Sequence, residues 1–339
     1  MSKFAGLRIA LLAGTLLFAP GNLESQNTCS NITVLANVLD RRGIPVKGLP
    51  KGVFKATYKG TPLNIVDATY SEKARRIAIL LDISGSMRGP EKLRSPVEGD
   101  KWRVALAVVA GVVTTAAAGT NFSMMTFADK IYDRLLPSSD NTEILRWIDS
   151  NARRKPNELH GRTALHAAIL QAAKQMEPAQ AGDAIYVVTD GGENASNISP
   201  AHVYRALQAS GTRLFTILLK EPHHFLEEYE HSGEVSEITL HSGGYQISIA
   251  PKTGNLQSTL NPQLTPPPPL YRFDDAMLTE IKAAAAMLDR QTEGFYLLTL
   301  ESKPLIRKPT EWKLEVTQLQ DSRESVLTYP RELLPCSMP

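Results

Sequence analysis

The chain of 339 residues has only two cysteines, Cys29 and Cys336, and no long apolar segment beyond its first 25 residues. So few cysteines exclude a small protein built on a disulfide framework, and a membrane span needs about 20 apolar residues. An excess of one charge is also missing, because 37 Lys and Arg residues face 35 Asp and Glu residues. The net charge of +2, with no basic stripe, argues against nucleic-acid binding and against lipid insertion of the mature chain.

The first residues predict export. Two basic residues, Lys3 and Arg8, precede the apolar run Ile9–Ala19. This run has the length of a signal-peptide core and is short for a bilayer span. Ser25 is a candidate cleavage position, so we assign residues 1–25 to a signal peptide. We expect a secreted, periplasmic or cell-surface protein. An uncleaved anchor or a buried N-terminal helix is the alternative.

The two cysteines lie near the two ends of the expected mature chain. In an exported protein such an even pair is a candidate disulfide, and closing so long a loop would restrict the unfolded chain strongly. Two free thiols or a lipid-modified Cys29 are the alternatives.

Residues 73–255 alternate between buried-strand runs and helical patterns. The expected strands are Arg76–Leu81, Asn121–Phe127, Ala184–Thr189, Leu214–Leu219 and Gln246–Ala250, and the expected helices are Trp102–Val113, Glu143–Ser150, Ala164–Met176 and Pro200–Ala209. Such alternation predicts a doubly wound α/β domain with a mostly parallel sheet. Lys130–Leu136 is expected to add a short edge strand.

Segments of β pattern flank this domain on both sides. Residues 26–72 show strand alternation, and residues 274–339 begin with a helix and return to strands. Residues 256–273 form a proline-rich linker between the α/β domain and that helix. Neither flank has enough strands for stability alone, so we expect them to pair in one small β domain into which the α/β domain is inserted.

Oxygen-bearing side chains gather where the expected strands end. Asp82, Ser84 and Ser86 follow the first strand, Asp190 ends the Ala184–Thr189 strand, and Thr163 opens a helix. In open α/β sheets, ligands bind at the carboxyl ends of the strands. Two carboxylates and three hydroxyls are hard ligands that favour Mg²⁺ or Mn²⁺ over Zn²⁺ or copper. Five groups leave a sixth position, for which an Asp or Glu side chain of a partner is the natural candidate.

These residues resemble a known site. Asp82-x-Ser84-x-Ser86, Thr163 and Asp190 are similar, in every ligand position, to the metal-ion-dependent adhesion site of von Willebrand factor A-type domains, over residues 73–255. The flanks resemble those of bacterial secreted proteins related to this family. The resemblance implies a Rossmann-like fold with Mg²⁺ at the top of the sheet. Ser84, Ser86 and Thr163 would bind it directly or nearly so, and Asp82 and Asp190 directly or through water.

The sequence departs from the pattern in a long polar insertion, Arg88–Lys101. An ordinary alternative also remains for the motif, in which Ser84 and Ser86 cap a helix or turn and Asp190 is a turn residue.

Several weaker features have more ordinary interpretations. We expect His160 and His166 to be rim residues rather than ligands, and Glu193 to be a solvated loop residue rather than a support for the metal ligands. The histidines at positions 223, 224, 231 and 241 match no zinc spacing and are expected at exposed helix ends.

Three functions remain open. The first is a metal-dependent adhesion or protein-binding module. The second is a structural envelope protein in which the metal stabilises the rim of the sheet. The third is a metal-assisted phosphoester hydrolase, but the sequence has no Gly-x-Ser-x-Gly, P-loop or HExxH motif, so we expect no enzyme.

Overall fold

A six-stranded sheet forms the centre of the computed structural model, which describes residues 31–72, 75–88, 100–220, 226–250, 273, 275–303, 306–317 and 326–335. In the order β10-β9-β8-β5-β6-β7, the strands are parallel except β7, which runs antiparallel to β6 at the edge. Their bounds are β5 (Arg76–Asp82), β6 (Asn121–Phe127), β7 (Ile131–Ser138), β8 (Ala184–Thr189), β9 (Arg213–Leu219) and β10 (Gln246–Ile249). The mostly parallel α/β sheet and its edge strand confirm the prediction.

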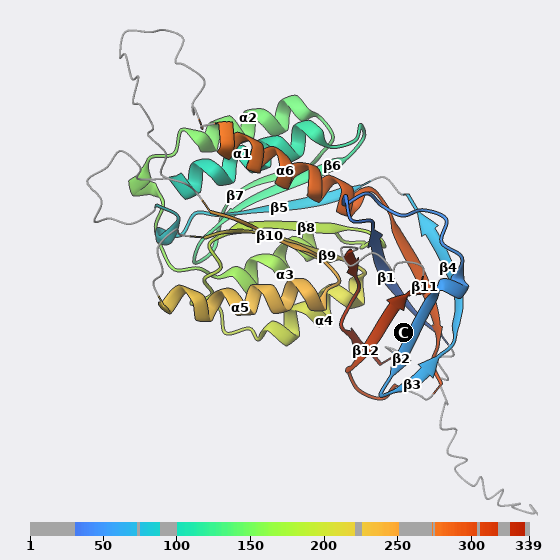
Figure 1. Cartoon of the computed structure of the whole chain (residues 1–339). Coiled ribbons are helices and arrows are strands. Elements are labelled where there is room, and N and C mark those ends of the chain that lie inside the picture. Colours follow the sequence, from blue (N-terminus) through green and yellow to red (C-terminus); the bar gives the residue numbers. More distant parts are fainter. Residues whose placement is uncertain are drawn as a thin grey trace, which may run out of the picture.

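Helices cover both faces of this sheet (Figure 1). One face carries α1 (Asp100–Thr115), α2 (Asn141–Ala152) and α6 (Asp275–Glu293), and the other carries α3 (Leu165–Gln175), α4 (Pro200–Ser210) and α5 (Leu226–His241). Short 3-10 turns are η1 (Lys51–Val53), η2 (Gly85–Arg88) and η3 (Pro156–Glu158).

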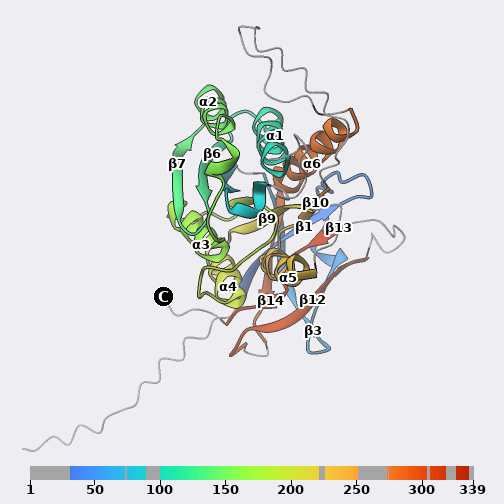
Figure 2. The same ribbon diagram turned by 90° about the vertical axis from the view of Figure 1, so that its left-hand side faces the viewer.

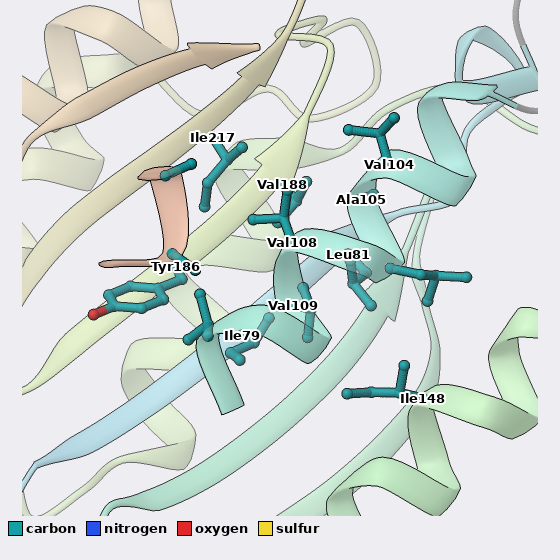
Figure 3. Close-up of a cluster of buried hydrophobic side chains, with 14 of the residues drawn as sticks. Ile79, Leu81, Val104, Ala105, Val108, Val109, Ile148, Tyr186, Val188 and Ile217 are labelled. Atoms are coloured by element: carbon teal, nitrogen blue, oxygen red, sulfur yellow. The ribbon is translucent and has the colours of Figure 1, made fainter. Parts of the chain in front are cut away.

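The central strands are buried on both sides, as their continuous apolar sequence predicts. In β5, Ile79 and Leu81 point into the core under α1 and α6, whereas Leu80 points into the core against α3 and α4. Figure 3 shows the first of these cores, with Val108 and Val109 of α1 packed over the strands. The two cores hold the strand ends at fixed positions.

Strands from the two flanks pair with one another in two further four-stranded sheets, ordered β13-β1-β11-β4 and β14-β12-β2-β3. Their bounds are β1 (Asn31–Leu39), β2 (Phe54–Tyr58), β3 (Thr61–Leu63), β4 (Ile65–Ser71), β11 (Phe295–Glu301), β12 (Thr310–Val316), β13 (Val326–Thr328) and β14 (Glu332–Leu333). Buried side chains such as Phe54, Leu298 and Trp312 form a third hydrophobic core between them.

The flanking sheets lie beside the amino-terminal ends of the central strands. Gly182, just before β8, lies against the ring of Phe295, and a methyl carbon of Leu35 lies 3.9 Å from where a Cβ of Gly211 would be, just before β9. The carboxyl ends of the central strands therefore point away from the flanking sheets, and Figure 2 looks onto that end.

The structure differs from the sequence prediction in one helix. The sequence pattern did not predict α5, because Glu227, Glu228 and Glu230 interrupt any apolar face. The expected signal peptide, the two cysteines and nearly all of the linker lie outside the described residues. No helix in the described part of the chain is both long and apolar enough for a membrane crossing.

Candidate metal centre

Asp82 is the last residue of β5 and is fully buried. Its Oδ1 accepts a hydrogen bond from the Ser84 backbone N–H at 2.8 Å, and its Oδ2 accepts one from the Thr189 hydroxyl at 2.6 Å. Burial, together with the charge of Asp190, raises the pKa of Asp82 to about 7, although the bonds from Thr189 and Ser84 act in the opposite direction. The ionised form of this carboxyl is therefore costly unless a cation lies nearby.

The turn after β5 carries the two serines. The Ser84 Oγ and Ser86 Oγ atoms are 3.1 Å apart, with Ser84 buried and Ser86 exposed at the start of η2. The Gly85 N–H donates to the Gly161 carbonyl at 3.2 Å, which ties this turn to the loop that precedes α3. Gly161 has φ +92°, and a Cβ there would lie 3.1 Å from a carboxylate oxygen of Asp129, so glycine suits this crossing of two loops.

Thr163 lies in that loop, two residues before α3 begins at Leu165, and is buried. Its backbone exchanges hydrogen bonds with Asn194: the Thr163 N–H donates to the Asn194 Oδ1 at 2.8 Å, and the Asn194 N–H donates to the Thr163 carbonyl at 3.0 Å. The Thr163 hydroxyl lies 3.9 Å from where a Cβ of Gly192 would be. The loop after β8 and the loop before α3 are therefore joined.

Asp190 follows β8 directly, and β8 lies beside β5 in the sheet. Its Oδ2 accepts a hydrogen bond at 3.0 Å from the Nζ of Lys101, in the first turn of α1, and both side chains are only 4% exposed. A buried ion pair thus forms within the set of candidate ligands. Lys101 is the last residue of the polar insertion Arg88–Lys101, and the sequence pattern predicts no role for it at the site.

The environments of Glu193 and His166 differ from the predicted ones. Glu193 is buried, and its carboxylate accepts hydrogen bonds from the backbone N–H groups of His166, Ala195 and Ser196, at 2.8–2.9 Å, and from the Ser196 hydroxyl. Burial alone would raise the pKa of Glu193, but these bonds lower it below its usual value. The prediction of a solvated loop residue is wrong, because Glu193 organises the loop that carries Asn194.

His166 lies in α3 and is 1% exposed, so it is a core residue rather than a rim residue, and its Nδ1 lies 2.6 Å from the Ile198 carbonyl oxygen. His160 is exposed, as expected at a rim. His223 and His224 lie outside the described residues, and the His241 ring stacks on Tyr204 with centroids 4.5 Å apart.

All five predicted ligand residues therefore lie at one end of the central sheet, on three loops that hydrogen bonds connect. The donor set fits a hard divalent cation, because it consists of carboxylate and hydroxyl oxygens and has a buried acid that favours a neighbouring positive charge. The Lys101 ammonium beside Asp190 also indicates an environment that accepts a cation. Within the described residues, no group of three or more His, Cys, Asp and Glu side chains could hold a metal ion, so the candidate site depends on its hydroxyl ligands as well as on its two carboxylates.

Residues 77–193, about a third of the chain, match the family model of the von Willebrand factor type A domain. This segment is similar to the von Willebrand factor type A domain family. It runs from β5 to the loop after β8, and so contains all five predicted ligand residues as well as Lys101 and Glu193. No curated protein matches the chain.

Similar solved structures include three proteins with low sequence identity. An aerotolerance-related membrane protein from Bacteroides fragilis is 17% identical, with a TM-score of 0.44, and the match covers 65% of this chain and 98% of that one. BatB from Bacteroides thetaiotaomicron is 19% identical, with a TM-score of 0.42 and coverage of 63% and 100%. Proximal thread matrix protein 1 from the mussel byssus, solved with a zinc-occupied metal-ion-dependent adhesion site, is 18% identical, with a TM-score of 0.39 and coverage of 64% and 48%.

Proposed function

We propose that this A-type domain is a divalent-metal-dependent protein-binding or adhesion module. The observation that carries the proposal is the arrangement of Asp82 and Asp190 at the ends of adjacent strands, beside the hydroxyls of Ser84, Ser86 and Thr163. These residues would hold Mg²⁺ or Mn²⁺. Bound there, the ion would supply a Lewis-acidic position for a carboxylate oxygen of a partner's Asp or Glu.

Neighbouring residues orient the predicted ligands. Thr189 and the Ser84 N–H fix the orientation of the Asp82 carboxylate, and Glu193 holds the loop that positions Thr163 through Asn194. Because the two helix-covered cores make the strand ends rigid, the ligands are held in place before a partner arrives. The exposed Ser86 lies on the side that an outside carboxylate would approach.

A binding role also agrees with the contacts of the neighbouring acidic and basic side chains, which are already engaged within the protein. Glu193 already accepts four hydrogen bonds, Lys101 is paired with Asp190, and His166 is buried in α3. A hydrolase would need a further general base or nucleophile within reach of a substrate. We therefore propose that the domain binds rather than catalyses, and turnover of a phosphoester that depends on added metal would contradict this.

We further propose that the chain is exported and that its flanks form one β domain into which the A-type domain is inserted. The charged start and apolar run of residues 1–25 support the first part. The pairing of β1 with β11 and of β2 with β12, around a core of their own, supports the second.

The test is a calorimetric titration of the metal-free protein with Mg²⁺ and with Mn²⁺. Wild type should bind one ion, whereas Asp82→Asn and Thr163→Val should lose at least about tenfold in affinity, because each removes one oxygen ligand while keeping the side-chain shape. Asp149→Asn is the control, since Asp149 lies on the exposed surface of α2 and pairs only with Arg153 among the described residues. Folded wild type that binds neither ion would contradict the proposal.

A second measurement separates the adhesion role from a structural one. Partner proteins retained on the immobilised domain should elute with EDTA and should not be retained by Asp82→Asn. If the ion instead raises the melting temperature and no protein is retained in a metal-dependent way, the ion stabilises the rim and the structural alternative holds.

A further inference from the structure

Lys101 is an unusual residue for its position. It lies in the first turn of α1, where the helix dipole is unfavourable for a cation, and it is only 3% exposed, although lysine is almost never fully buried without a partner. Its neighbours Trp102 and Val104 are buried in the core and anchor this end of the helix. The helix therefore does not explain the burial of the ammonium, whereas the carboxylate of Asp190 at 3.0 Å does.

We propose that Lys101 is an internal cation that competes with the divalent ion for Asp190 and thereby sets the affinity of the site. The inference rests on the proposed function, since it concerns the same site. It adds a residue that the metal-binding motif does not contain.

Counting charges at the site gives the reason for competition. The ionised carboxylates of Asp82 and Asp190 carry two negative charges, and Lys101 balances one of them. A divalent ion bound to Asp190 beside an unmoved Lys101 would place two cations against one carboxylate. Because the surroundings are buried, water screens this repulsion only weakly. Binding of the ion therefore requires the ammonium to leave Asp190, and the flexible four-carbon side chain of lysine can do so without movement of the helix.

The same contact stabilises the protein without metal. Asp82 and Asp190 are both buried at the ends of the adjacent strands β5 and β8, so the two acids repel each other when both are ionised. The ammonium of Lys101 reduces this repulsion while the ion is absent. Lys101 therefore has opposite effects on the two forms: it stabilises the metal-free domain and weakens the binding of metal.

The test is a titration of Lys101→Met with Mg²⁺ and Mn²⁺ beside wild type. Methionine keeps the length and apolar stem of lysine but has no charge, so the affinity should rise by at least about tenfold, in keeping with the loss of one charge near the ion. Lys101→Arg should bind no more tightly than wild type. Lys282→Met, an exposed position on α6, is the matched control and should leave the affinity unchanged.

The outcomes separate this inference from the proposed function. If wild type and Lys101→Met both bind with equal affinity, the inference is wrong and the metal site stands. If neither binds, both are wrong. If only Lys101→Met binds, the inference holds and Lys101 keeps the site closed to metal under the conditions used.

A melting experiment in EDTA adds a measurement that needs no metal. Lys101→Met should have a lower melting temperature than wild type, and added Mg²⁺ should raise its melting temperature by more, because its Asp190 has no ammonium nearby.

A labelling experiment tests the displacement in wild type without any substitution. Lysine side chains are reductively methylated, and mass spectrometry shows which of them have reacted. Lys101 should be protected in EDTA and reactive at saturating Mg²⁺. Continued protection at saturation would overturn the displacement.

Discussion

At the scale of single residues, Asp82 links the site to pH. Its pKa is raised in the folded metal-free protein, so between about pH 4 and pH 7 the folded state holds a proton that the unfolded state has lost. Unfolding then releases a proton, and the stability of the metal-free protein must fall as the pH rises through this window. Above pH 7 the cost of burying the charge is fully present.

We predict that Asp82→Asn removes this pH dependence. In EDTA the variant should be more stable than wild type at pH 8, by at least about 1.4 kcal/mol, the free energy of one pKa unit. The difference should shrink as the pH falls below 7, because Asp82 of the folded wild type takes up its proton, and it should vanish only below about pH 3, where Asp82 is neutral in both states. Urea unfolding of both proteins at several pH values measures it, and a difference that stays constant across the window would contradict the assignment to Asp82.

The five predicted ligand residues could be placed from the sequence because each lies beside a recognisable strand end or helix start. Lys101 could not, because its charge neutralises a residue that is 89 positions away, and it follows a run of polar residues that conceals the start of α1. Glu193 was assigned wrongly for a related reason. A glutamate in a loop is usually solvated, and only the tertiary contact with α3 shows that its carboxylate is buried.

At the scale of elements, the contact between α1 and α6 joins parts of the chain on the two sides of the expected linker. Gly111 of α1 faces α6 so closely that a Cβ would lie 3.3 Å from the Cβ of Ala285 and 4.0 Å from a methyl carbon of Ile281. The small residues let the two helices approach over the sheet. The sequence predicts one apolar face of this helix from Leu278, Ile281, Ala285 and Leu288. The last three are buried and Leu278 is half-buried, but their spacing does not indicate which helix the face meets.

We predict that Gly111→Leu destabilises the protein by about 1–3 kcal/mol, because the added side chain overpacks this contact. Gly233→Leu is the matched control, since Gly233 lies in α5 with no atom within 4 Å of a Cβ position. There the gain in helix propensity should raise stability by up to about 1 kcal/mol. Denaturant unfolding measures both, and equal effects at the two positions would show that the helix contact is not tight.

At the scale of the whole molecule, a buried polar group joins the central α/β domain to the flanking sheets. Arg213 of β9 is 1% exposed, and its guanidinium lies 5.2 Å from the ring centre of Phe215 and 5.4 Å from that of Phe295 in β11. It pairs with no carboxylate among the described residues, and burial lowers its pKa to about 10. The two aromatic rings and the Gln291 carbonyl, 3.4 Å from Nη1, are its main interactions there.

We predict that Arg213→Met keeps or raises the stability of the protein, because methionine fills much of the same volume without the cost of a buried charge. Arg213→Ala should lose about 2–5 kcal/mol through the cavity it leaves. Thermal unfolding of both variants separates the contributions of charge and packing. A loss in Arg213→Met as large as in Arg213→Ala would mean that the charge itself stabilises the contact.

The pairing of the two flanks has a consequence for how the protein is made. Both sheet neighbours of β1, the strands β11 and β13, are synthesised more than 250 residues after it. At about 5–20 residues per second, the ribosome needs on the order of ten seconds to a minute to supply them. Throughout that time the apolar strand Asn31–Leu39 has a free edge, which can pair with other chains. A growing chain of this protein is therefore expected to depend on chaperones until its last strands emerge.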